Sequence, residues 1–473
     1  MLLQVNTGPS SERLLPSSST QIDLRESRFV WLCVGTTSLM SALQCGFGTG
    51  ALNNLDVIVP ATFAQKELWL KPGQWSLVVA AFAIGGLVGS ILGKCTFCTR
   101  WGVKVVFLVN NILVFASSAF LMLCAEWQEL CIGRVLLGLS VGLSSSISPL
   151  YLAEITPPSL RSVIGNCHRL GIPIGIVASQ LLTTPEVSPL ATVQLWQYIF
   201  LLPICFSLIE LSVIHFCPEA PSHIFRTSGS SAAMALLTQL FGPQGAASHL
   251  EALHVEAAAR EDQGPASIAE LLRDGQLRHP LLIAMTTALS IPLSGVDIVL
   301  CYSCLVLRHA GLTSPQWATV GIGIFYAAAT LGGLLLVKTM RLRALLLSSW
   351  AVLALSYAVL AAVTIRSQHL SMEHPSQAFC SWLAIGAQLG VVGAFAVGPG
   401  AIGWFAVAEM LPMQSKDAGM ALGVSASWTA STLVAWGFPV WRQALGALIF
   451  IAFSASSAVF CAFTYFWVPD IKA

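Results

Sequence analysis

Long apolar runs recur along the whole chain, and each is close to the roughly 20 residues that a helix needs to cross a bilayer. Only 10% of the 473 residues are charged, against about 25% in ordinary soluble domains. Hydropathy therefore predicts a polytopic membrane protein with about twelve spans. We place them at 29–50, 75–94, 103–123, 131–152, 163–183, 195–216, 280–304, 317–337, 344–364, 379–405, 418–438 and 443–467.

The spans fall into two sets of six, separated by a polar segment. We predict an N-terminal six-helix bundle at 29–216, a helical linker at 217–279 and a C-terminal six-helix bundle at 280–473. The linker contains two amphipathic stretches, "EALHVEAAARED" and "SIAELLRDGQLRHP". Residues 1–28 are polar and Ser-rich, which predicts a disordered tail. Lys and Arg fall mostly on the side of the N-terminus, so both termini and the linker are expected in the cytoplasm.

Several classes of function find no support in the sequence. No basic tract is long enough to indicate nucleic-acid binding, and no GxxxxGK[ST] phosphate loop is present. Cys95 and Cys98 form a CxxC without a second Cys or His pair at zinc spacing. No arrangement of nucleophile and base appears. We therefore expect neither an enzyme nor a metal or cofactor site.

Three stretches carry a resemblance to a known family. They are "WSLVVAAFAIGGLVGSILG" at 75–93, "IGRVLLGLSVGLSSSISPLYLAEITPPSLR" at 132–161 and "VGPGAIGWFAVAEMLP" at 397–412. With "HFCPEAPSHIF" after the sixth span and "PLSGVDIVLCYS" in the seventh, they resemble the sugar-porter, glucose-transporter-like branch of the major facilitator superfamily. The departures described below make the chain a divergent member. The resemblance implies an all-α membrane protein with the twelve-helix major facilitator fold.

In that fold a solute site lies between the two bundles, near the middle of the membrane, and opens to each side in turn. Charges at the cytoplasmic ends of the spans would form a gate that holds the inner side closed. The alternative is that they are ordinary flanking charges that only fix topology, but acids add little to topology and here they lie among the bases, which favours the gate. The gate set is Arg100, Lys104, Glu154, Arg161, Glu219, Glu409 and Lys416.

Glycine and proline add two expectations about helix geometry. Gly85, Gly86 and Gly89 in the second span are expected to let helices approach closely. The "GPG" at 398–400 is expected to break or kink the tenth span, since proline removes a backbone hydrogen bond.

The positions that match the family's sugar contacts are mostly changed. The family has Gln where this chain has Arg169, Asn where it has Asp297, and Glu where it has Ala396. A sugar needs several amide and carboxylate partners for its hydroxyls. The candidate solute site nevertheless comprises Gln44, Asn53, Arg169, Ile172, Ile176, Gln180, Asp297, Trp404 and Trp428. Gly48 stands where proton-coupled relatives carry an Asp, which favours facilitated diffusion.

Arg169 lies inside a span, where an ionisable group is a functional-site hypothesis when a partner can be named. The partner we name is Asp297, because the matching family positions face one cavity from opposite bundles. The alternative is that Arg169 snorkels back to the cytoplasmic edge, about 12 Å away at 1.5 Å per residue. His168 is expected to pack between helices.

The leading expectation is a secondary transporter for a small polar solute, with hexose or a related sugar or polyol as the family default. Two alternatives stay open. One is a transport-deficient relative that acts as a sensor, receptor or membrane partner, since the gate is also changed: Ser222 replaces an arginine of the family's motif. The other is a carrier of a charged organic solute with proton coupling at Asp297.

Overall fold

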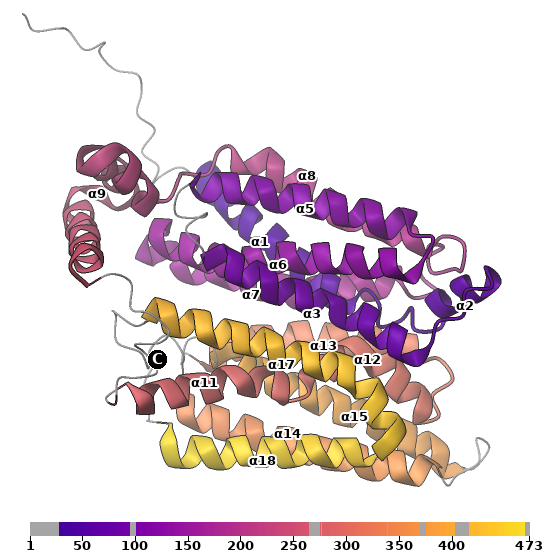
Figure 1. Ribbon diagram of the computed structural model, residues 1–473. Helices are drawn as coiled ribbons and strands as arrows, with labels where there is room; N and C mark the ends of the chain where they lie inside the picture. Colours follow the sequence, from indigo (N-terminus) through magenta and orange to yellow (C-terminus); the bar gives the residue numbers. More distant parts are fainter. Residues whose placement is uncertain are drawn as a thin grey trace, which may run out of the picture.

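The computed structural model describes the chain at 28–94, 101–263, 275, 277–337, 339–368, 375–402 and 416–468. The described residues are almost entirely helical, and their helices lie roughly parallel in two packed groups (Figure 1). The tail predicted at 1–28 falls outside the described residues except for Arg28, which begins the first helix.

The N-terminal bundle contains the helices of the first group. They are α1 (Arg28–Gly50), α2 (Ile58–Gln65), α3 (Pro72–Lys94), α5 (Val103–Leu123), α6 (Trp127–Ile155), α7 (Pro158–Leu182), the short 3₁₀ helix η1 (Trp196–Phe200) and α8 (Leu201–Ile214). Helix α2 lies at one end of this bundle, which we call the α2 end (Figure 1).

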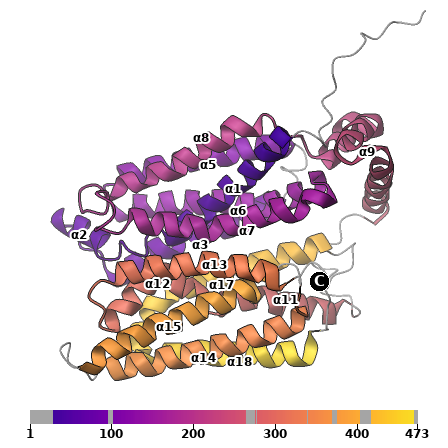
Figure 2. The ribbon, with the colours of Figure 1, turned by 180° about the vertical axis from the view of Figure 1, so that it is seen from behind.

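The C-terminal bundle contains the helices of the second group. They are α11 (Arg278–Leu293), α12 (Val296–His309), α13 (Pro315–Leu336), α14 (Leu342–Gln368), α15 (Pro375–Val397), α17 (Lys416–Leu445) and α18 (Leu448–Trp467). The connecting element α9 (Pro221–Gln263) lies beyond the opposite end, the α9 end, in both views (Figures 1 and 2). It turns at Gly229 and Gly242, which have φ angles of 86° and 75° that favour glycine.

Ten helical segments in the described part of the chain are long and apolar enough to cross a membrane. Helices α7 and α17, with 25 and 30 residues, are less apolar and pack among them. With these two, the predicted twelve-helix layout is confirmed. Both carry polar side chains that face other helices, which explains why their mean hydropathy is lower.

The glycines predicted to permit close helix packing do so. A methyl group added at Gly85 would lie 2.1 Å from the carbonyl oxygen of Val135 on α6, and one at Gly89 would lie 2.1 Å from that of Leu139. A methyl group added at Gly138 of α6 would likewise lie 1.9 Å from the Phe82 carbonyl oxygen of α3. Backbones this close leave no room for side chains, and such contacts drive helix association in lipid.

The predicted interruption of the tenth span occurs at Gly398. Helix α15 ends at Val397, Gly398 forms a turn, and helical structure resumes as far as Ile402. The amides of Ala401 and Ile402 both donate to the Gly398 carbonyl, at 3.0 Å each.

The seventh span differs from the continuous helix predicted at 280–304. It is broken into α11 and α12 at Ser294 and Gly295, and it extends to His309. Gly295 has a φ of 79°, a left-handed conformation that side-chain-bearing residues adopt at a cost. Pro292 lies one turn earlier and supplies no amide donor. The break therefore creates a new helix N-terminus inside the membrane.

Replacing Gly295 by alanine should destabilise the protein, because the added methyl group would lie 2.6 Å from the Tyr357 hydroxyl and the left-handed backbone resists it. We expect a loss of about 1–2 kcal/mol from the backbone conformation alone, measured as a lower melting temperature in detergent. Gly321→Ala is the matched control, since that helical glycine has nothing within 4 Å of an added methyl group. An equal melting temperature for Gly295→Ala and wild type would contradict the packing described here.

Candidate functional site

The two bundles meet along helices contributed by both. Helix α3 packs against α17, and α7 packs against α13. At the first contact the Trp428 ring lies against Gly86, where an added methyl group would come within 2.5 Å of the ring. The Phe82 ring meets the same indole edge to face, with centroids 6.2 Å apart. An aromatic side chain of one bundle thus fills a space that a glycine leaves on the other.

Asp297 lies in the first turn of α12, directly after the break in the seventh span. Its carboxylate accepts a hydrogen bond of 2.7 Å from the Ser431 hydroxyl of α17. A helix N-terminus favours negative charge because its first amides are unpaired and the helix dipole is positive there. The break therefore places a carboxyl group inside the membrane at the N-terminus of α12, with one hydrogen bond from α17.

Arg169 is half-buried on α7, and the described residues contain no ion pair between it and Asp297. The pairing we predicted is therefore not formed in this conformation. Tyr326 of α13 lies within electrostatic range of both charges. Both charged groups are thus present near the bundle interface, and neither neutralises the other. The neighbouring His168 packs as expected, with Nδ1 3.2 Å from the Ser38 carbonyl oxygen of α1.

The other predicted solute contacts divide into two sets. Gln180 is buried, and its side-chain oxygen points at Gly323 of α13 without a hydrogen-bond partner among the described residues. Gln44, by contrast, donates to the Ser207 hydroxyl of α8 at 3.1 Å, so it faces the interior of the N-terminal bundle. Ile172 and Ile176 pack against glycines of α1. Trp404 lies outside the described residues.

At the α2 end, Asn53 follows α1 and binds α12 of the other bundle. Its side-chain amide donates to the Leu300 carbonyl at 3.0 Å and to the Ser303 hydroxyl at 2.7 Å. Its side-chain oxygen accepts from the Cys304 amide at 3.2 Å. Asn53 thus uses donors and acceptor together to hold the bundles at this end.

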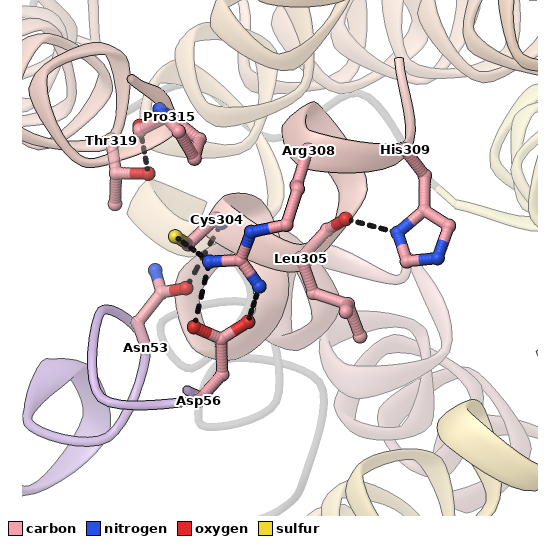
Figure 3. A network of polar contacts seen from close by, with 8 residues as sticks. All are labelled: Asn53, Asp56, Cys304, Leu305, Arg308, His309, Pro315 and Thr319. Carbon is pink, nitrogen blue, oxygen red and sulfur yellow. Dashed lines mark hydrogen bonds and ion pairs between the residues drawn. The ribbon is translucent and has the colours of Figure 1, made fainter. Parts of the chain in front are cut away.

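An ion pair strengthens the same contact (Figure 3). Two guanidinium nitrogens of Arg308 on α12 donate hydrogen bonds to the Asp56 carboxylate, at 2.6 and 3.1 Å. Only 7% of the Asp56 side chain is exposed, and Arg308 also reaches the Cys304 sulfur at 3.4 Å. We call Asn53, Asp56, Ser303, Cys304 and Arg308 the α2-end contact. Sequence reasoning missed this pair because its members are 252 residues apart.

Arg134 is a second charged residue that sequence reasoning left out of the site. It is only 1% exposed, donates to the Gly48 carbonyl at 2.6 Å, and lies 4.8 Å from the centre of the Phe82 ring. The sequence did contain a sign of this role, because an arginine inside an apolar run is by default a candidate functional residue. Gly48 and Phe82 together supply the hydrogen bond and the cation–π contact that replace water.

Three residues of the predicted gate bind backbone or hydroxyl groups at the α9 end. Glu219 accepts from the Val103 amide at the start of α5, at 2.8 Å. Glu154 accepts from the Ser222 hydroxyl at 2.6 Å, so the serine that replaces the family's arginine still binds a gate carboxylate. Lys104 donates to the His215 carbonyl at 3.2 Å. Arg100, Glu409 and the side chains of Arg161 and Lys416 lie outside the described residues.

Two helical bundles with charged and polar groups at their interface define a membrane carrier of the major facilitator fold. A family model described as "Sugar (and other) transporter" matches residues 31–473. The chain therefore belongs to the sugar transporter family, whose members are carriers and not enzymes.

Similar proteins span nearly the whole chain. The facilitated glucose transporter member 3 of Homo sapiens is 30% identical over 452 residues, covering 92% of this chain and 89% of the relative. Member 4 of Homo sapiens is 31% identical over 457 residues, covering 92% and 87%. A solved structure of the proton:xylose symporter XylE superposes with a TM-score of 0.75 at 19% identity, covering 94% of this chain and 97% of XylE. A structure of XylE from E. coli in a partially occluded inward open conformation gives 0.73.

Breaking the ion pair of the α2-end contact should expose the contact to water. For Asp56→Asn or Arg308→Gln we expect the contact between the bundles to lose about 1 kcal/mol of stabilising free energy, since the ion pair is bidentate but partly exposed. The fully buried Cys304 thiol should then react several-fold faster with a membrane-impermeant maleimide, quantified by mass spectrometry.

Two further variants make this test specific. The exchanged pair Asp56→Arg with Arg308→Asp should restore part of the protection of Cys304. Arg366→Gln, at an exposed arginine that ends α14, should leave labelling unchanged. Equal labelling in all variants would show that the ion pair does not hold the α2 end closed.

Proposed function

We propose that the chain is a secondary carrier that moves a hexose or a related sugar or polyol across a membrane by facilitated diffusion. The observation that carries the proposal is the α2-end contact, in which side chains of one bundle bind side-chain and backbone groups of the other at one end. Contacts of this kind can form and break while each bundle stays intact, as alternating access requires. The relatives named as facilitated glucose transporters support a sugar as the solute.

The moving parts are the two bundles predicted at 29–216 and 280–473, with 217–279 as the linker. The excess of Lys and Arg supports a cytoplasmic α9 end with both termini inside. The α2 end then faces outward, and the conformation described here is closed to the outside. The bonds of Glu154 and Glu219 at the α9 end would be part of the inner gate, which forms fully when that end closes.

The solute would lie between the bundles near Asp297, Arg169, Gln180 and Trp428. Asp297 holds one hydrogen bond from Ser431, and a carboxylate has room to accept several more. The unpartnered oxygen of Gln180 can accept from a sugar hydroxyl. The Trp428 ring offers an apolar face for the carbons of the sugar ring.

Facilitated diffusion is supported by Gly48, which lacks a carboxylate at the position where proton-coupled relatives carry one. Arg134 binds the backbone carbonyl of that residue. The guanidinium thus has a hydrogen-bond acceptor that cannot be protonated near neutral pH, while its Nε has no partner among the described residues.

A second candidate solute is favoured by the separation of Arg169 and Asp297. Two opposite charges that do not pair with each other can each bind a charged group of an organic solute. This reading would make the substrate an organic ion, and a proton on Asp297 would then be coupled to its movement.

Purified protein in liposomes decides between these solutes. We expect saturable uptake of labelled hexoses or polyols that needs no pH gradient. Asp297→Asn should weaken apparent affinity about fivefold, because a hydrogen bond to a charged acceptor contributes about 1 kcal/mol more than one to a neutral acceptor. Glu251→Gln, an exposed acid on α9, is the control and should match wild type.

The remaining outcomes are equally informative. Uptake of organic ions in place of sugars, lost in Arg169→Gln, would favour the second candidate. No uptake of any solute by folded protein would contradict both and favour the sensor or receptor alternative.

A further inference from the structure

Glu210 on α8 is a carboxyl group buried completely inside the N-terminal bundle, at 0% exposure. Both of its carboxyl oxygens lack a hydrogen-bond partner among the described residues. It is not part of the solute site or the gate set. An ionised carboxylate without a partner is among the most costly groups to place in a membrane interior.

Two side-chain amides lie around Glu210, and each already donates one hydrogen bond elsewhere. Asn111 of α5 lies beside it, but the Asn111 amide nitrogen donates to the Phe107 carbonyl at 2.8 Å. Gln44 of α1 donates its amide to Ser207, one turn before Glu210. The side-chain oxygens of Asn111 and Gln44 are also unpartnered. Four acceptor oxygens on three side chains therefore have no hydrogen-bond partner among the described residues, although each amide nitrogen keeps one further N–H.

No positive charge of the described residues compensates Glu210. The titratable and charged groups on the neighbouring elements are Arg28, Cys33 and Cys45 on α1, Lys104 on α5, Glu129, Cys131, Arg134, Tyr151 and Glu154 on α6, Tyr198 in η1, Cys205 on α8, and His215 and Cys217 just after α8. Arg28 is sixteen residues from Gln44, about 24 Å along α1, and Arg134 binds the Gly48 carbonyl. Lys104 is seven residues from Asn111, about 10 Å along the helix, and it binds the His215 carbonyl. The Tyr151 hydroxyl donates to the Pro218 carbonyl, and the Cys217 thiol lies against Thr37.

We propose that Glu210 is a proton-binding site inside the N-terminal bundle, occupied in the conformation described here. The bound proton removes the charge and supplies an O–H donor for one of the unpartnered amide oxygens. Loss of the proton leaves a carboxylate between α1, α5 and α8 with no partner. The stabilising state is the protonated one, so stability is present at low pH and falls as the pH rises through ionisation.

Infrared spectroscopy of the full-length protein tests the site directly. The wild type should show the carbonyl stretch of a protonated carboxylic acid at neutral pH, and E210Q should lose it. Asp297→Asn separates the contribution of the other membrane carboxyl. If E210Q does not fold, E210D serves in its place, and the band should shift in frequency. A spectrum that is identical in wild type and the Glu210 variant overturns the proposal.

The melting temperature in detergent gives a second readout. For wild type and the control Glu186→Gln, an exposed loop acid, it should fall by several degrees between about pH 6 and pH 9. E210Q should lack the fall, because its amide cannot ionise. A fall of equal size in E210Q and wild type overturns the proposal. Neither measurement needs a solute, so the outcome is independent of the proposed transport function.

Discussion

Polar groups that enter the membrane must find their partners within the protein, and this constraint organises the structure. Backbone amides and carbonyls meet it by forming helices. Where a helix is interrupted, the freed groups need a different solution. At the break between α11 and α12 the Val296 amide donates to the Ser294 hydroxyl at 3.3 Å, and the Asp297 carboxylate accepts from Ser431. The buried Arg134 meets the same requirement in part, with the Gly48 carbonyl and the Phe82 ring, while its Nε has no partner among the described residues.

The arrangement of helices was largely predictable from the sequence, because lipid reduces the choice of structure to apolar helices of a fixed length. The close packing at the glycines of α3 was also predictable, since residues without side chains allow neighbouring helices to approach. The break at Gly295 was missed because the apolar pattern continues across it. Only the backbone angle, at a φ of 79°, shows why glycine is needed there.

The polar contacts of the site were harder to predict. A periodic pattern tells which residues face the same side of one helix, but it does not tell which helix they meet. Gln44 was expected toward the solute and instead binds Ser207 of α8. Asp56 and Arg308 lie in separate bundles and form a pair that no local pattern contains. The Ser222 substitution reads as a loss in sequence, yet its hydroxyl still binds Glu154.

The contact between Trp428 and Gly86 bears on how the bundles move. The ring fills the space above a bare glycine backbone and meets the Phe82 ring edge to face, so this contact consists of nonpolar packing. The α2-end contact, with its five polar side chains or amides, behaves in the opposite way. Separating the bundles would therefore break directional polar bonds at the α2 end, but only nonpolar packing at Trp428.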